Sequence, residues 1–235
     1  MMKHDRPALS LPARNALMLG CILLLLAAGS GLSLFAADRS GSIRFSWAFL
    51  YQGKDGVTRP IDYDKRVVRL QSGDKLKIYL KPQDACHIYL YLYDAQNDLF
   101  LLFPEAFGQS TPNPRVTKNF ELPGVNSWYY LDEQTGMETF YLIISAQPLE
   151  DLEKRTKQYF SGLTNDRTNR QIMTYKYGVL DEIKRLIKEG SYLSEGAEKP
   201  IAVAGDFRGI REERDLNGVH IEAAQIYVKT IRLAH

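Results

Sequence analysis

The stretch that most restricts the fold is CHIYLYLY, residues 86–93, because an extended chain of this sequence offers little polar surface on either side. Side chains of a strand alternate between its two faces, which gives two sets: Cys86, Ile88, Leu90 and Leu92, and His87, Tyr89, Tyr91 and Tyr93. A strand that is apolar on both faces is usually central and covered on both sides. We therefore expect the three tyrosines to be core residues. The alternative is an exposed aromatic strip that grips a peptide or glycan.

From residue 43 to about residue 145 the hydrophobic pattern has a period of two, which is typical of short strands. IRFSWAFLY (43–51) places its large apolar side chains, Trp47 among them, on one face. KLKIYLK (75–81) directs Leu76, Ile78 and Leu80 inward and Lys75, Lys77 and Lys81 outward. RVVRL, HIYLYLY, LFLLF and TFYLIIS predict further strands, and QGKDG, QSGD, KPQD and DAQND predict turns between them. Closely spaced strands of this kind indicate an antiparallel β-sandwich or a partly open barrel.

The pattern changes after Pro148, where PLEDLEKRTKQYFSG predicts a helix. LTNDRTNR separates it from a second helix, whose apolar stripe contains Ile172, Tyr175, Val179, Ile183, Leu186 and Ile187. Gly190 is the expected stop of this helix. PIAVAGDF and AAQIYVKTIRLAH are strand-like again, and a terminal strand needs a partner, so we expect it to return to the sheet. The predicted fold is mainly β with a late helical excursion (α+β), with two helices packed on one side.

The first 37 residues have the order of a secretory signal, a short basic segment followed by an uncharged run from Ala16 to Ala37. That run is also long enough to cross a bilayer as an uncleaved anchor. LMLGC resembles a lipoprotein box, but Cys21 lies near the start of the apolar run instead of after it. We expect cleavage, with an anchor as the alternative. In either case residues 38–235 are exported, to the periplasm or to the periplasmic side of the inner membrane.

Residues 38–235 are expected to form one mature domain, with a core motif region at 66–148, a helical excursion at 149–190 and C-terminal strands at 200–235. Without the charges of the signal segment, 27 basic and 27 acidic residues balance. A balanced charge gives no footprint for nucleic acid or anionic lipid, so we expect membrane contact only through an uncleaved N-terminus. Cys86 is the one cysteine after the signal, which excludes an intramolecular disulfide, and its phase predicts a small buried hydrophobe.

The sequence contains none of the usual motifs for nucleophilic catalysis, zinc or phosphate binding. HIE places His220 and Glu222 on one side of an extended segment, but two ligands do not make a metal site. Asp94, Asn97 and Asp98 lack the spacing of a calcium loop and are good turn formers. REERD (211–215) is best interpreted as a solvated loop, with an interaction surface as the alternative. We predict no catalytic residue, no metal ligand and no cofactor.

Six short elements follow one another in a fixed order: Gly73-Asp74 in L-x-x-G-D, Tyr89 to Tyr91, Leu102-Phe103-Pro104, Asn113 to Val116, Gly136 to Glu138 in G-x-E, and Ser145 to Pro148. This order resembles the DUF4384 family of bacterial exported domains. The resemblance covers about residues 66–148 and extends to the closing YVKTIRLAH. The family's name records an unknown function, so the resemblance implies an exported module and no particular activity. We expect Gly73-Asp74 to make a turn and Gly136 to require a positive φ.

These observations favour a non-catalytic module of the bacterial cell envelope that binds a protein partner or a cell-wall component. Its expected binding surface is an aromatic patch of Trp47, Trp128, Tyr129 and Tyr130. Acidic residues are plentiful, so a carboxylate-dependent hydrolase of cell-wall glycans is the alternative. A membrane-anchored structural subunit is a second alternative. The sequence does not decide the oligomeric state.

Overall fold

The computed structural model describes residues 43–104, 115–165, 167–193, 198–202 and 217–235, all of which belong to one compact unit, Gly41–His235. The predicted signal segment and the REERD loop lie outside these residues. Within them, neither helix is long and apolar enough to cross a membrane.

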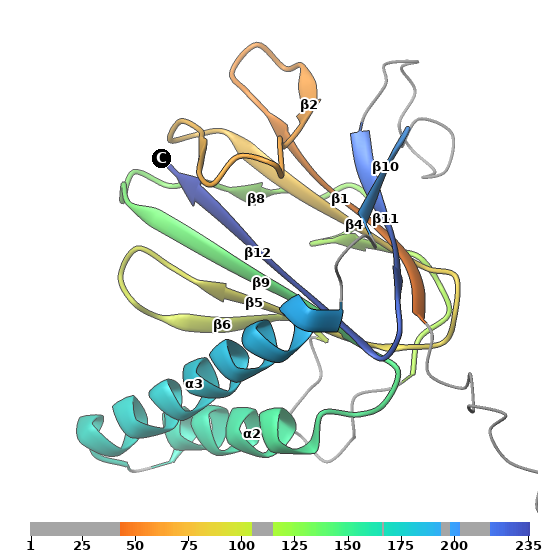
Figure 1. The fold of residues 1–235 in the computed structure, drawn as a ribbon. Coiled ribbons are helices and arrows are strands. Elements are labelled where there is room, and N and C mark those ends of the chain that lie inside the picture. The colour runs from red at the N-terminus through yellow and green to blue at the C-terminus, as the bar shows by residue number, and fades with distance from the viewer. Residues whose placement is uncertain (1–42, 105–114, 166, 194–197, 203–216) are drawn as a thin grey trace, which may run out of the picture. The chain divides into compact units, whose positions relative to one another are not determined.

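The first of two sheets, sheet A, has the strand order β10-β11-β1-β4-β7, with β2 beside β1 and β8 beside β4 (Figure 1). Its strands are β1 (Ile43–Gln52), β2 (Thr58–Pro60), β4 (Lys75–Pro82), β7 (Phe120–Leu122), β8 (Tyr129–Tyr130), β10 (Glu198–Ala202) and β11 (Asn217–Ala223). All of the pairings in sheet A are antiparallel.

The second sheet, sheet B, has the order β3-β12-β9-β5-β6. Its strands are β3 (Val68–Arg69), β5 (His87–Tyr93), β6 (Leu99–Phe103), β9 (Met137–Ser145) and β12 (Ile226–Ala234). The terminal strand β12 pairs antiparallel with β9 and parallel with β3, so the end of the chain returns to the interior of a sheet, as predicted.

The main core lies between the two sheets and is built from the inward phase of each strand. Trp47 and Phe49 of β1, Ile78 of β4, and Ile88 and Leu90 of β5 are at most 2% exposed there. Trp47 packs edge-on against Phe49, and its indole N–H donates to the hydroxyl of Tyr227 at 3.1 Å. The apolar residues that recur at every second position of these strands therefore form the layer between the sheets.

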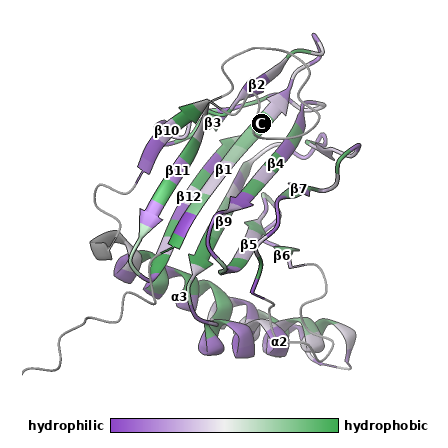
Figure 2. Ribbon diagram, turned by 90° about the vertical axis from the view of Figure 1, so that its right-hand side faces the viewer, coloured by the Kyte–Doolittle hydropathy of each residue, from purple (hydrophilic) through white to green (hydrophobic). Residues whose placement is uncertain are grey.

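Two helices, α2 (Glu150–Thr164) and α3 (Asn169–Leu193), cover the other face of sheet B (Figure 1). Figure 2 shows that both helices mix hydrophobic and hydrophilic residues along their length, as amphipathic helices do. Their apolar stripe, including Val179 and Ile183, packs on Tyr89, Tyr91 and Ile143 of the sheet. The fold is thus a β-sandwich with a helical layer on one side, and the predicted α+β class is confirmed.

The tyrosines of β5 fasten this helical layer to the sheet. Tyr89 and Tyr91 are fully buried, and the Tyr89 hydroxyl donates to Glu153 Oε1 at 2.8 Å and accepts from the Leu149 N–H at 2.9 Å. The Tyr91 hydroxyl lies 2.8 Å from Thr156 Oγ1. Only Tyr93 reaches the edge, where its hydroxyl donates to Asn97 Oδ1. Tyr89 and Tyr91 are core residues, and the exposed-strip alternative is wrong for them.

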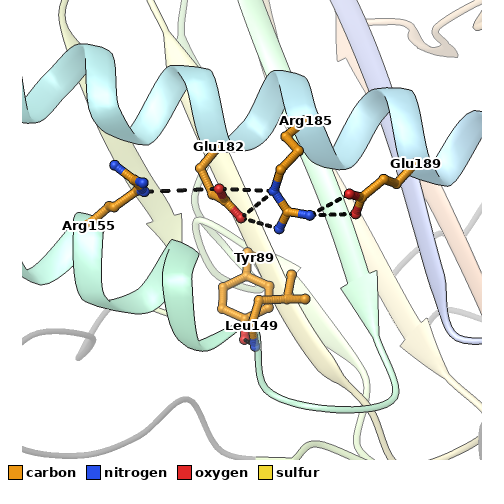
Figure 3. A network of polar contacts seen from close by, with 6 residues as sticks. All are labelled: Tyr89, Leu149, Arg155, Glu182, Arg185 and Glu189. Atoms are coloured by element: carbon orange, nitrogen blue, oxygen red, sulfur yellow. Dashed lines mark hydrogen bonds and ion pairs between the residues drawn. The ribbon is translucent and has the colours of Figure 1, made fainter.

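A polar network links the two helices (Figure 3). Glu182 of α3 is buried and lies between Arg155 of α2, at 4.0 Å, and Arg185 of its own helix. Arg185 also donates to Glu189 at 2.5 Å, and the two carboxyl groups raise the pKa of its guanidinium. Every charged group of this network has a partner, so we interpret it as structural.

Two details differ from the expectations. Lys77 was expected to point to solvent, but its side chain is buried: its Nζ donates to the Val125 carbonyl at 2.5 Å and lies 5.0 Å from the Trp128 ring centre. The chain segment after β7 folds over it, which the β4 pattern does not reveal. Gly190 does not end α3; its missing side chain lets the helix approach β12, since a Cβ there would lie 3.2 Å from Val228 Cγ2.

Cys86 is fully buried, and burial raises the pKa of its thiol to about 12. Because the thiolate is the reactive form, we expect no reaction with an aromatic disulfide reagent at pH 8 until the protein unfolds. The measurement uses Cys21→Ser in the full chain, so that Cys86 is the only thiol. Rapid labelling of the native protein would contradict the buried position.

Candidate binding cleft at one end of the sandwich

A cleft of about 180 Å³ opens at one end of the sandwich, and both sheets contribute to it. We call it the end cleft. Its lining residues are Leu76, Leu92, Asp94, Gln96, Leu102, Tyr129, Tyr130, Leu131, Asp132, Glu138, Phe140 and His235. The aliphatic side chains and Phe140 come from strands or strand ends and form an apolar floor. The polar residues come mainly from the turn after β5, the segment after β8, and the residue after β12.

Glu138 supplies the most unusual polar atom of the end cleft. Its side chain is 8% exposed, and its Oε1 accepts a weak hydrogen bond from the Ala95 N–H at 3.3 Å. Its buried Oε2 finds no hydrogen-bond partner among the residues that the structure describes. Burial, with the neighbouring Asp94 and Asp132 carboxylates, raises the pKa of Glu138. A buried acceptor without a partner costs free energy, so a ligand that donates to it is favoured.

His235 lies beside it, with a side chain only 2% exposed. Its backbone pairs with Gly136 through two hydrogen bonds, of 2.9 and 3.3 Å, which hold the imidazole in the cleft. Neither ring nitrogen has a hydrogen-bond partner in the described part of the chain; Nε2 is 3.9 Å from Asp132 Oδ1. Glu138 Oε2 and both ring nitrogens of His235 are thus buried polar atoms without a partner among the described residues, which distinguishes the end cleft from ordinary surface.

We expect Glu138→Gln to stabilise the free protein at neutral pH by about 1 kcal/mol, because it removes a buried charge whose one hydrogen bond, from the Ala95 N–H, is weak. A raised carboxyl pKa means that the stability contributed by Glu138 is full below its ordinary pKa of 4.5 and is lost as the pH rises through the raised value. The gain from Gln should therefore vanish at acidic pH. Urea unfolding at pH 4 and pH 7 measures both. A loss of stability at pH 7 would contradict the account.

Gly136 fixes the position of the turn that carries Asp94 and Gln96. A Cβ at residue 136 would lie 2.5 Å from the Ala95 Cβ, closer than two carbons can approach. The expectation of a positive φ at Gly136 is wrong, since the positive-φ glycines of the described residues are Gly56 and Gly73. The requirement at 136 is close packing between the two segments.

Gly136→Ala is therefore expected to lower the free energy of unfolding by about 2 kcal/mol and to distort the end cleft. Gly124→Ala is the matched control, because its Cβ would meet nothing closer than 3.7 Å. Chemical unfolding of both variants measures the difference. Equal stability of the two variants would show that the segments do not meet as described.

The L-x-x-G-D turn holds the segment Tyr129–Leu131, which lines the end cleft, in position. Gly73 has φ +91°, and its N–H donates to the Leu131 carbonyl at 2.7 Å, while the Leu131 N–H donates to the Asp74 carbonyl at 3.0 Å. Asp74 also closes its own turn by accepting from the Gln71 N–H. These bonds fix Leu131 next to Tyr129 and Tyr130. The prediction that Gly73-Asp74 forms a turn is confirmed.

The predicted aromatic patch is only partly assembled. Trp47 is 1% exposed and lies in the core, because it belongs to the inward phase of β1, so it cannot be part of a surface patch. Trp128 is half-buried over Lys77, and Tyr129 packs partly against the core. Tyr130 is 67% exposed and, with Tyr129, lines the end cleft.

The other residues singled out in the sequence have local roles. Asp94 and Asn97 build the turn after β5, in which the Asp98 N–H donates to Asp94 Oδ1 at 2.6 Å. His220 Nδ1 lies 3.0 Å from Ser46 Oγ, and His220 Nε2 lies 3.6 Å from Glu222, so the two do share one side of β11.

Sequence reasoning did not find Glu138 and His235 as site residues. Glu138 stands in a strand-like segment, and His235 follows the last strand, so neither has a local pattern that marks a ligand. The one sequence signal that pointed to the end cleft is the order of the family elements. Gly73-Asp74, Leu102 and Gly136 to Glu138 are far apart in the chain, yet all of them line or support the end cleft.

Comparison with known proteins supports the family resemblance seen in these elements. Residues 69–148 match the family model described as "Domain of unknown function (DUF4384)", and every lining residue of the end cleft except His235 falls within this segment. No curated protein and no solved structure matches the chain. The family resemblance predicted from the sequence is thus confirmed for residues 69–148, which match the DUF4384 family model.

Proposed function

We propose that this chain is a non-catalytic binding module of the bacterial cell envelope that holds a protein partner at the end cleft. The observation that carries the proposal is a set of buried polar atoms in an open cleft, Glu138 Oε2 and the two ring nitrogens of His235, which have no hydrogen-bond partner among the described residues. A folded protein tolerates such groups at sites where a ligand completes them.

The volume of the end cleft and the exposed Tyr130 that lines it favour a protein partner over a glycan. Clefts that enclose a multi-ring ligand usually exceed about 300 Å³, whereas this one measures about 180 Å³ and suits a single side chain. Exposed tyrosine is common at the energetic centres of protein interfaces, and Tyr130 stands at the mouth. Part of the aromatic surface inferred from the sequence therefore supports the proposal.

Export is supported by the composition of the first 37 residues, a basic start and a long uncharged run. The test is to express the full chain, fractionate the cells and read the N-terminus by mass spectrometry. A start near Asp38 in the periplasm supports a cleaved module, and an intact N-terminus in the inner membrane supports the anchored subunit. Recovery from the cytoplasm would overturn the envelope assignment.

The partner is tested by placing a photoreactive phenylalanine analogue at position 130 in living cells. Position 177 on α3 is the matched control, because Tyr177 is also an exposed tyrosine, at 47% against 67% for Tyr130. We expect a discrete crosslinked protein from position 130 and none of the same mass from position 177. Identical patterns from the two positions would contradict a partner at the end cleft.

A second candidate, the carboxylate-dependent hydrolase, is favoured by one observation. Glu138 has a raised pKa and shares the end cleft with Asp94 and Asp132, an environment in which a carboxylic acid can stay protonated and donate. Incubation of the purified chain with peptidoglycan fragments tests it. Turnover that Glu138→Gln abolishes would replace the binding module with a hydrolase.

A further inference from the structure

We infer that the end cleft binds one alkylammonium group, the side chain of a lysine of the partner, with the ammonium at Glu138 and the methylene stem on the apolar floor. The inference rests on the proposed function, because it names the chemistry by which the partner is held.

The charge of the end cleft selects a cation. Three of its lining residues are carboxylic acids, Asp94, Asp132 and Glu138, and its lining contains neither lysine nor arginine. Lys75 stands outside the lining, with its Nζ 5.5 Å from the centre of the Tyr130 ring. A ligand carboxylate would face three like charges, whereas an ammonium donates a charge-assisted hydrogen bond to the free Oε2 of Glu138.

The floor and the volume select a long apolar stem. Leu76, Leu92, Leu102 and Phe140 line the end cleft with apolar surface, and Leu76 and Phe140 are buried. A lysine buries its methylene stem along apolar surface while its ammonium head reaches a polar group. A guanidinium is broader and planar, and it is better matched to a bidentate carboxylate than to Glu138, whose Oε1 already accepts from the Ala95 N–H.

The geometry also predicts how the affinity of the end cleft for a cation changes with pH. The groups that face Glu138 are Asp94, Asp132 and His235, from the turn after β5, the segment after β8 and the residue after β12. Protonation of Glu138 removes the negative charge that its carboxyl group offers to a cationic ligand. Affinity should therefore fall as the pH drops through the raised pKa of Glu138.

The test is calorimetric titration of the purified full chain, in the form the cell processes it, with Nα-acetyl-lysine methylamide. Nα-acetyl-norleucine methylamide is the matched probe, because it has a similar stem without the ammonium. We expect the lysine derivative to bind at least about 30-fold more tightly, the ratio that corresponds to the loss of one buried charged partner. 1-Aminopentane is the third probe. Binding of 1-aminopentane without the lysine derivative would assign the cleft to free amines and overturn the partner's lysine.

Two buried glutamates give the matched variants. Glu138 and Glu153 are 8% and 7% exposed, but Glu153 belongs to α2 and accepts a hydrogen bond from the Tyr89 hydroxyl. Glu138→Gln should abolish lysine binding and Glu153→Gln should leave it unchanged. Asp132→Asn changes an exposed rim residue and should weaken binding only about threefold. Equal affinity in the wild type and Glu138→Gln, or equal affinity for lysine and norleucine, would overturn the inference.

The outcomes separate this inference from the proposed function. If a partner is captured at position 130 but no lysine derivative binds, the proposed binding module is supported and the inferred ammonium site is overturned. If the lysine derivative binds but no partner is captured, the ammonium site is supported and the proposal of a protein partner is overturned.

Discussion

Trp47→Ala is expected to lower the free energy of unfolding by about 3–5 kcal/mol, the usual cost of truncating a large buried aromatic side chain. The ring is 1% exposed, packs against Phe49 and Tyr63, and donates to the Tyr227 hydroxyl, which is itself buried. Alanine would therefore leave a cavity between the sheets and a tyrosine hydroxyl with one partner fewer. Urea unfolding of the full chain, followed by circular dichroism, measures the loss.

The protein contains a matched control, because Trp47 and Trp128 are its two tryptophans. Trp128 is half-buried and covers the Nζ of Lys77 at 5.0 Å, so Trp128→Ala should cost only about 1 kcal/mol. If the two substitutions destabilise the protein equally, Trp47 is not a core residue and the assignment of the inner layer is wrong.

Tyr89→Phe is expected to destabilise the protein by about 3 kcal/mol although only one oxygen is removed. The Tyr89 hydroxyl donates to the buried Glu153 and accepts from the Leu149 N–H at the start of α2. Figure 3 shows Tyr89 beside Leu149. Each buried polar group left without its partner costs about 1–3 kcal/mol. The loss should concentrate in the helical layer, so amide hydrogen exchange should accelerate in α2 before it does in β9.

Tyr93→Phe tests whether this effect depends on burial. Its hydroxyl bonds to Asn97 at the edge of the sheet, where water can replace the bond, so we expect less than about 0.5 kcal/mol. A double-mutant cycle of Tyr89→Phe with Glu153→Gln should show coupling of about 1 kcal/mol or more. Additive effects would mean that the Tyr89 hydroxyl does not depend on Glu153.

Much of the fold follows from local patterns. The alternation in β1 and β4 predicts the inner layer, and the doubly apolar β5 predicts a cover on both of its faces, which the second sheet and the helices provide. The stripe around Ile183 predicts which side of α3 faces the sheet. These features depend on periods of two and 3.6, which a sequence displays directly.

The end cleft could not be predicted in the same way. It requires that the turn after β5, the segment after β8 and the residue after β12 meet at one end of the sandwich, and these contacts depend on strand order. Lys77 illustrates the same limit, because its burial depends on the segment around Val125, which lies 48 residues later in the chain. Trp47 was assigned to the surface by residue type, although its phase in β1 already placed it inward.

The measurement that tests the central claim most directly is the yield of partner crosslinked from position 130 in the Glu138→Gln and Glu153→Gln backgrounds. Both substitutions remove one buried carboxyl group, but only Glu138 lines the end cleft. We predict that Glu138→Gln abolishes the crosslink while Glu153→Gln retains it. Equal yields in the two backgrounds would show that the end cleft is not where this protein holds its partner.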